Sequence, residues 1–205
     1  MFIYGNHNIR LSPIWNRAKT LFPESESMEV LMSNPRKITY TALFLAFSIL
    51  LPQIFHLFGG TGPVFLPMHI PVLLAGLYLG GIQGALIGFL APIFSSFLTG
   101  MPVIPILYFM IVEVTVYGFA AGYFYQKKKL NIYVSLILSM IVGRVFLALT
   151  VFTLQPLLGL KISPAAYFTG ALLTGIPGML IQLLFIPAMI RLLEKAGEHV
   201  VRNNA

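Results

Sequence analysis

The sequence predicts an all-α integral membrane protein in which six transmembrane helices form one compact bundle, and three observations support that fold class. Hydrophobic residues make up 58% of the 205 residues and charged residues only 9%. Six long apolar stretches fill residues 38–193, with few charges inside them. Each stretch is continuously apolar rather than alternating, which favours helices over a β-barrel. Because an unpaired backbone group is costly in hydrocarbon, each span must pair its own backbone as a helix does.

Glycine and proline mark the limits of the first three spans. The first covers about residues 38–58 and ends at a Gly-Gly-Thr-Gly-Pro sequence. The second covers about 67–79 and carries two prolines near its start. We expect this short span to be bent by its prolines, and therefore tilted or partly re-entrant. The third covers about 83–97 and is followed by Thr-Gly-Met-Pro.

The last three spans end at charged or helix-breaking residues. The fourth covers about 104–125 and meets three consecutive lysines. The fifth covers about 132–154 and is followed by Gln-Pro, and the sixth covers about 165–193. The connections on the side without the lysines are then residues 59–66, 99–104 and 155–164, all rich in glycine and proline.

Basic residues beside the spans gather on one side of this arrangement. They are Arg36, Lys37, Lys127, Lys128, Lys129, Arg191, Lys195 and Arg202, whereas the opposite loops contain Lys161 alone. Cytoplasmic loops of membrane proteins carry an excess of lysine and arginine. The sequence therefore predicts a multi-pass protein with both termini in the cytoplasm.

The chain is expected to have three parts. Residues 1–34 form a cytoplasmic extension without an apolar run long enough to span. The alternatives are a surface helix and an artefact of the start site, because Met-Ser-Asn-Pro-Arg-Lys at 32–37 resembles a natural start of translation. The extension lacks the apolar core and cleavage site of a secretory signal. Residues 35–195 form the membrane domain, and 196–205 form a cytoplasmic tail.

Several classes of function lack the residues they require. The chain has no cysteine, and it shows no phosphate-binding loop, dinucleotide fingerprint or pair of metal-ligating histidines. Its basic residues form short clusters between spans instead of a patch for nucleic acid. We therefore expect no cofactor, no metal site and no nucleic-acid partner. In an ATP-driven assembly, another subunit would hydrolyse the ATP.

Glu113 in the fourth span and Arg144 in the fifth are the ionisable residues that lie well inside spans. A charge within a membrane is costly, so such residues usually face the bundle interior or a cavity. Both are candidates for contact with a polar solute. Alternatively, they pair with each other across neighbouring helices and stabilise the packing. Glu113 lies nearer the outer end of its span than Arg144 does, so the sequence leaves their pairing open.

Other polar residues near the ends or interior of spans are further candidates for substrate binding. They are His69, Ser95, Thr99, Tyr117 and Gln155. His69 lies between two prolines, and helices broken by proline often border a solute site. The alternatives are a histidine satisfied within a bent helix, and hydroxyl, phenol and amide groups that join helices or lie at the membrane interface.

Small residues at four-residue spacing form two groups. Ala42 and Ala46 lie on one face of the first span and would let another helix approach closely. Four glycines at positions 76, 80, 84 and 88 continue the spacing from the second span into the third. We expect the glycines to give tight internal packing, and the two alanines to be the better candidates for docking a partner subunit.

These features together resemble the substrate-binding S component of an energy-coupling factor (ECF) vitamin transporter. The resemblance covers residues 35–193 and includes the six spans and the Ala-x-x-x-Ala face of the first. Its motifs are the Leu-Pro-Met-His-Ile-Pro-containing stretch 66–80, Gly-Ala-Leu-Ile-Gly-Phe at 84–89, Thr-Gly-Met-Pro at 99–102, and residues 113–118 with Gly122.

The resemblance implies an activity, partners and a location. An S component binds one vitamin or related micronutrient at the outer face of a prokaryotic plasma membrane. It then joins a membrane scaffold subunit and two ATPase subunits, and it is thought to topple within the membrane. Ala42 and Ala46 match the small-residue contact with the scaffold. By region, the ligand would lie near residues 59–64 and 95–99 and parts of the last three spans.

The motifs identify the family more specifically than they identify its substrate. The His-Ile-Pro stretch and the Glu-x-x-x-Tyr-Gly sequence of the fourth span resemble the pantothenate-type branch. Arg144 could then meet the carboxylate in a charge-assisted hydrogen bond. Folate is also anionic, a pyridoxine-type solute could use tyrosines and Glu113, and riboflavin is a further alternative.

Two other classes of protein fit the sequence less well than an S component does. A membrane-embedded enzyme needs a nucleophile with a base, two acids or a metal, yet the chain has no aspartate and one glutamate inside a span. A stand-alone secondary carrier is the stronger alternative. It is disfavoured because inverted repeats and further charges for ion coupling are not evident.

Overall fold

The structure, a computed structural model, describes residues 35–57, 62–157, 159 and 163–195. The predicted extension and tail, the glycines at 59 and 60 and most of the last outer loop lie outside these residues. The chain divides into two compact units, residues 1–38 and 39–205. Of the first unit, only the opening residues of one helix are described, and the architecture below is that of the second unit.

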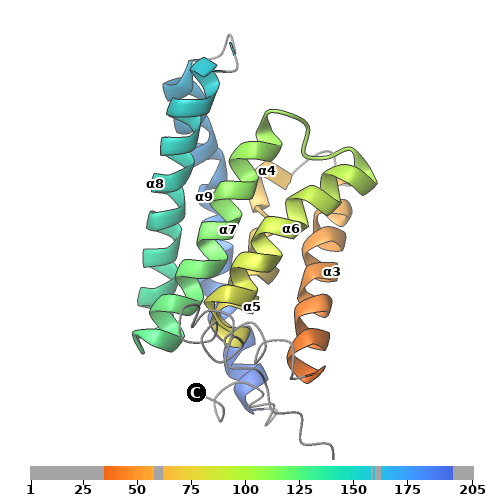
Figure 1. Cartoon of the computed structure of the whole chain (residues 1–205). Helices are drawn as coiled ribbons and strands as arrows, with labels where there is room; N and C mark the ends of the chain where they lie inside the picture. The colour runs from red at the N-terminus through yellow and green to blue at the C-terminus, as the bar shows by residue number, and fades with distance from the viewer. Residues whose placement is uncertain (1–34, 58–61, 158, 160–162, 196–205) are drawn as a thin grey trace, which may run out of the picture. The chain divides into compact units, whose positions relative to one another are not determined.

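All regular elements in the described residues are helical (Figure 1). They are α3 (Pro35–Leu57), α4 (Gly62–Phe65), α5 (His69–Leu79), α6 (Gly81–Thr99), α7 (Ile106–Gly122), the π-helix η1 (Tyr123–Lys127), α8 (Ile132–Leu157) and α9 (Pro164–Lys195). Within the described residues, six helical segments are long and apolar enough to cross a membrane, and Gly62–Leu79 is the second. The predicted six-span helical fold is confirmed.

The second span is broken near its start. The Leu66 backbone N–H donates to the Gly62 carbonyl at 2.9 Å, which closes α4. Leu66 then takes a φ of 48°, and α5 begins at His69. The predicted proline-bent span is present, but residues 62–65, expected in a loop, form a helical turn. Pro63 suits this turn because the first residues of a helix need no N–H for an internal bond.

The fifth span also differs from its predicted end. Helix α8 continues through Gln155 and Pro156 to Leu157, whereas we expected the span to stop near residue 154. Proline has no N–H, so Pro156 forgoes one helical bond, to the Phe152 carbonyl, and α8 continues one residue beyond it. Gln155 therefore lies in the helix and not in the loop that follows.

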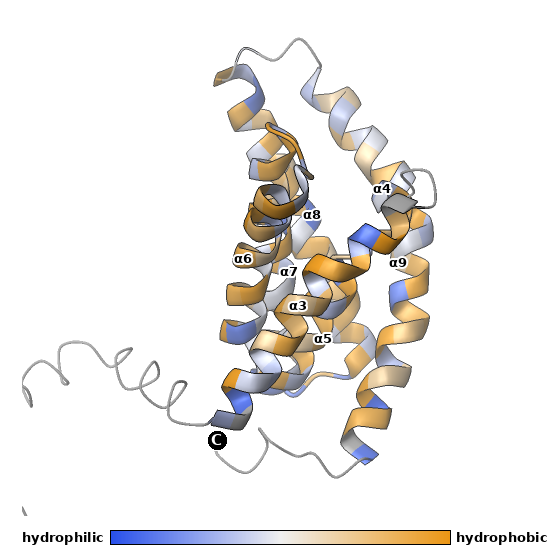
Figure 2. Cartoon of the chain, turned by 90° about the vertical axis from the view of Figure 1, so that its right-hand side faces the viewer, coloured by the Kyte–Doolittle hydropathy of each residue, from blue (hydrophilic) through white to orange (hydrophobic). Residues whose placement is uncertain are grey.

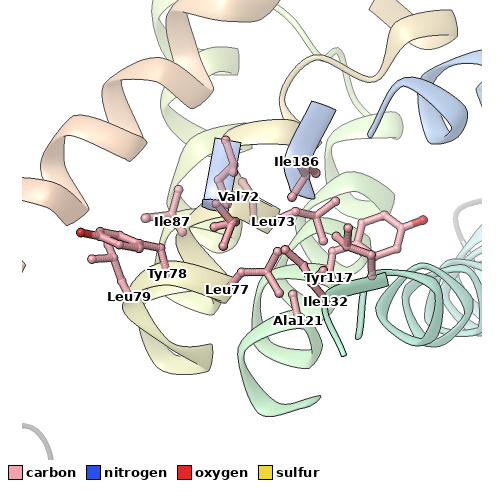
Figure 3. Packing of buried hydrophobic residues seen from close by; sticks show 14 of the residues in the cluster. Val72, Leu73, Leu77, Tyr78, Leu79, Ile87, Tyr117, Ala121, Ile132 and Ile186 are labelled. Carbon is pink, nitrogen blue, oxygen red and sulfur yellow. The ribbon is translucent and has the colours of Figure 1, made fainter. Parts of the chain in front are cut away.

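Helix α5 forms the centre of the bundle. Ten of its eleven residues are buried, all except Ile70. Figure 3 shows Val72, Leu73 and Leu77 of α5 packed near Tyr117 and Ile186, which belong to α7 and α9. A helix that is apolar all round must be enclosed by others. His69 is the first residue of α5, so the burial of this helix also fixes where His69 lies in the bundle.

Glycines bring α5, α6 and α7 into backbone contact. A Cβ added at Gly76 or at Gly84 would collide with the carbonyl of Gly118. At Gly88, a Cβ would collide with the Val114 carbonyl. Small residues let helices approach this closely within a membrane. The predicted internal packing role is confirmed for these three glycines, while Gly80 forms the turn between α5 and α6 with a φ of 115°.

The outward faces of the helices are apolar, as hydrocarbon requires. Figure 2 shows hydrophobic residues along most of the length of the helices. Helix α3 is the least buried of the six spans. Its exposed residues include Leu43, Phe47 and Leu50, together with Ala42 and Ala46. One face of α3 is therefore without a partner in the described part of the chain.

The close packing of α6 against α7 at Gly84 can be tested by substitution. Gly84→Val should lower the free energy of unfolding by roughly 1–3 kcal/mol, the usual cost of overpacking, because its side chain would meet the Gly118 carbonyl. Gly170→Ala is the control, since a Cβ at that position meets nothing within 4 Å beyond the adjoining backbone of its own helix. Thermal unfolding of both purified variants in detergent measures the difference. Equal midpoints would contradict the close packing.

Candidate functional site

A cavity of about 500 Å³ lies between the helices near the α6–α7 connection. Seven helices, α3 to α9, and two connecting segments contribute to its wall. Its lining residues are Pro52, Gly62, Pro63, Leu66, Pro67, Met68, His69, Ser95, Met101, Pro102, Val103, Ile106, Phe109, Met110, Glu113, Arg144, Leu147, Ala166, Tyr167, Gly170, Ala171 and Thr174. The wall is mainly apolar, with few polar side chains, and its volume falls in the range of small-molecule sites.

Three ionisable side chains meet at the cavity wall. Arg144 Nη1 lies 3.0 Å from Glu113 Oε1, and His69 Nε2 lies 3.9 Å from Glu113 Oε2. All three residues are at least nine-tenths buried, with exposed fractions of 8%, 5% and 2% for Arg144, Glu113 and His69. Glu113 and Arg144 therefore do form an ion pair across adjacent helices, which was one of the two interpretations of the sequence. Because both also line the cavity, pairing and solute contact do not exclude each other.

The polar cluster has hydrogen-bonding capacity that the described protein atoms leave unused. Nε and Nη2 of Arg144 are buried without a hydrogen-bond partner, as are both ring nitrogens of His69. Buried polar groups in folded proteins are usually paired, and exceptions often occur at functional sites. These four nitrogens are therefore the best candidates for contact with a polar group of a solute.

Aromatic packing positions the histidine. The rings of His69 and Tyr117 lie edge to face, with centroids 5.2 Å apart. Tyr117 in turn lies against Gly143 of α8, where a Cβ would collide with the phenol ring. Tyr117 thus packs against the His69 ring and does not line the cavity. This residue, predicted to bind the substrate, lies next to the cavity wall instead.

Glycine also makes room for the arginine. A Cβ at Gly175 of α9 would lie 2.6 Å from Arg144 Nη2 and 3.2 Å from Leu66 Cδ1. At Gly178, a Cβ would lie 2.8 Å from the Phe65 carbonyl oxygen. Helix α9 therefore approaches both the guanidinium and the short helix α4 through positions without side chains. No sequence pattern indicated that these two glycines of the sixth span face the site.

Hydroxyl groups at the end of α6 hold the α6–α7 connection over the cavity. Ser95 donates to the Met101 carbonyl at 2.8 Å, and Ser96 donates to the Pro102 carbonyl at 2.9 Å. Thr99 accepts from the Met101 backbone N–H at 3.2 Å. Met101 and Pro102 both line the cavity. Ser95 lines it too, but its hydroxyl proton is engaged by the connection.

The predicted binding residues thus fall into two groups. His69, Ser95, Glu113 and Arg144 line the cavity, whereas Thr99, Tyr117 and Gln155 do not. Thr99 is exposed, and Gln155 is buried near the end of α8. The residue-level prediction missed Phe109 and Tyr167, whose rings pack at 5.2 Å on the cavity wall. Aromatic residues are common throughout such a chain, so only the fold distinguishes these two.

The described residues contain no group of three histidine, cysteine, aspartate or glutamate side chains that could hold a metal ion.

Comparison with known families decides the class of protein. The family model for the ECF transporter, substrate-specific component, matches residues 36–190. The chain belongs to this family. No curated protein and no solved structure matches it. This S component is therefore a multi-pass membrane protein that serves as the substrate-binding subunit of a transporter, as the motifs in spans two to four indicated.

The buried ion pair of the S component can be tested by a double-mutant cycle. Arg144→Gln and Glu113→Gln should each lower the free energy of unfolding, by about 3–5 kcal/mol where a buried charge loses its partner. The double variant should be more stable than the sum of the two losses predicts, because no buried charge then remains unpaired. Thermal unfolding of the four proteins in detergent provides the comparison. Additive losses would show that the pair does not contribute as a unit.

Proposed function

We propose that this S component binds a small water-soluble vitamin in the cavity from the outer side of the membrane. It then delivers the vitamin into the cell together with the ECF scaffold subunit and two ATPase subunits. The observation that carries the proposal is the polar cluster of His69, Glu113 and Arg144, buried in a wall that is otherwise mainly apolar. A few convergent polar groups in an apolar pocket are typical of sites for small molecules.

The charge distribution supports outward binding. Figure 1 shows the α6–α7 connection at one end of the bundle and the C-terminal end of α9 at the other. The cavity lies near that connection, while Lys127–Lys129, Arg191 and Lys195 lie at the other end of their helices. Since positive loops favour the cytoplasm, the cavity would face outward and both termini would be cytoplasmic. The membrane would be the plasma membrane of a prokaryote.

Pantothenate is the substrate that we propose first. It carries one carboxylate, which the free Nε and Nη2 of Arg144 could bind through charge-assisted hydrogen bonds. The Glu-x-x-x-Tyr-Gly sequence at 113–118 adds the likeness to the pantothenate-type branch. The mainly apolar wall disfavours a large, highly charged solute such as folate. Pyridoxine and riboflavin are alternatives that make less use of the arginine.

The exposed face of α3 supports docking to the scaffold. Ala42 and Ala46 are both exposed, one helical turn apart, beside the large apolar side chains of Leu43 and Phe47. Two small residues at this spacing allow a partner helix to approach closely within the membrane. The same face has no partner in the described part of the chain, so it is free to receive one.

Binding is tested first by thermal stabilisation of the purified protein in detergent against a panel of B vitamins. A vitamin present at one hundred times its dissociation constant should add about 2.7 kcal/mol of apparent stability. A selective shift with pantothenate supports the substrate that we propose, and a shift with another vitamin corrects it. A folded protein that responds to no vitamin, or that transports alone in vesicles under an ion gradient, would instead indicate a secondary carrier.

Docking is tested by Ala42→Trp and Ala46→Trp. Each should abolish vitamin uptake by the assembled transporter, because the indole would hold the two helices apart, while the isolated S component keeps its affinity for the vitamin. Leu180→Trp on the exposed face of α9 is the matched control. Uptake at the wild-type rate in both alanine variants would place the docking surface elsewhere.

A further inference from the structure

The charges at the cavity wall balance before any solute binds. Arg144 and Glu113 carry opposite formal charges and lie 3.0 Å apart. The remaining ionisable side chains on the described wall are His69 and Tyr167, and a phenol is uncharged near neutral pH. With a neutral His69, the cluster has a net charge of zero. An anion that entered this poorly solvated site would therefore add a charge that nothing compensates.

The free hydrogen-bond donors nevertheless favour an anion. Nε and Nη2 of Arg144 are donors under all conditions, because the guanidinium does not lose its proton. Both are buried without a partner in a residue that lines the cavity. This edge of the guanidinium matches the two oxygens of a carboxylate. Glu113 engages Nη1, the remaining terminal nitrogen, and so fixes which edge is presented to the cavity.

His69 can supply the positive charge that an anion bound to Arg144 would require. Its Nε2 lies 3.9 Å from Glu113 Oε2, and neither ring nitrogen has a hydrogen-bond partner. The charged or titratable groups that face it are Glu113 and Tyr117 from α7 and Arg144 from α8. On the described wall, α6 contributes Ser95, α9 contributes the phenol of Tyr167, and α3 contributes Pro52, none of which carries a charge near neutral pH.

We infer that the cavity recognises a monocarboxylic acid and that His69 takes up one proton from solvent when the acid binds. This rests on the proposed function, because it concerns the substrate of the same cavity. The carboxylate accepts hydrogen bonds from Nε and Nη2 of Arg144, and the imidazolium lies beside Glu113. Two positive and two negative charges then give a net charge of zero. The solute enters as an anion and the site gains no net charge.

The same arrangement limits the substrate to one acidic group. The other side chains of the described wall are uncharged, and they are mostly apolar residues such as Phe109 and Leu147. A second carboxylate or a phosphate would be desolvated there without a cationic partner. The neutral analogue of a substrate would lose the charge-assisted bonds to Arg144. The site should therefore prefer a monoanion over both its neutral analogue and a polyanion.

The experiment measures the affinity of the purified full chain for three pairs of acid and neutral analogue. The pairs are pantothenate and panthenol, nicotinate and nicotinamide, and biotin and biotin amide. One acid should bind at least about tenfold more tightly than its neutral analogue, as expected for a charge-assisted bond. Its dissociation constant should rise as the pH is raised from 5.5 to 8.5, by no more than tenfold per pH unit for the uptake of one proton. The acids stay ionised throughout this range.

Two variants separate the roles of His69 and Arg144. His69→Gln should abolish the pH dependence and keep the preference for the acid. Gly175→Ala should weaken binding of the acid at every pH, because its Cβ would lie 2.6 Å from Nη2 and displace the guanidinium without changing any charge. Leu173→Ala, two residues away on the lipid-facing surface of α9, is the matched control and should leave both properties unchanged.

Several outcomes would overturn the inference. Equal affinity for an acid and its neutral analogue would rule out the carboxylate contact, and a wild-type affinity independent of pH would rule out proton uptake. The pH series needs no variant, so the test holds if His69→Gln does not fold. Binding of a vitamin without a carboxylate, and of no acid, would overturn this inference and leave the proposed function intact. A folded protein that binds no vitamin at all would contradict both.

Discussion

The backbone contact between α6 and α7 is the constraint on which the rest of the bundle depends. Gly84 and Gly118 lie so close that a Cβ on either would collide with the other residue's backbone. Without a hydrophobic force between helices in lipid, such close packing supplies much of the attraction. Gly118 lies five residues after Glu113 on α7, so the same contact fixes how far the carboxylate reaches toward α5 and α8. A wider spacing would separate it from both His69 and Arg144.

The buried polar cluster joins helices, and in the proposed function it also contacts the solute. An ion pair inside a bundle costs desolvation, and its attraction offsets that cost only when the geometry is good. Here the pair joins α7 to α8, yet one edge of the guanidinium and both imidazole nitrogens remain without hydrogen-bond partners among the described protein atoms. A purely structural pair would be expected to satisfy these groups within the protein. The incomplete pairing is the observation on which the proposed contact with a solute rests.

Several side chains hold the cavity wall in place without offering a free polar group to a ligand. Tyr117 holds the His69 ring, and the hydroxyls of Ser95, Ser96 and Thr99 hold the segment that carries Met101 and Pro102. A binding site formed by fixed side chains loses less conformational freedom when its ligand arrives. High affinity in so small a bundle would depend on this support as well as on the direct contacts.

The sequence by itself determined that this is a membrane protein, how many spans it has and to which family it belongs. Continuous apolar stretches, the glycine and proline between them and the motifs of spans two to four were sufficient, because hydrocarbon permits so few backbone arrangements. It also identified Glu113 and Arg144, since charges inside spans are rare. Only the tertiary structure decided that these two pair, that His69 joins them, and that Thr99, Tyr117 and Gln155 lie off the cavity wall. Those outcomes depend on helix rotation and depth, which are set by glycine contacts between segments far apart in the chain and leave no periodic signal within any one span.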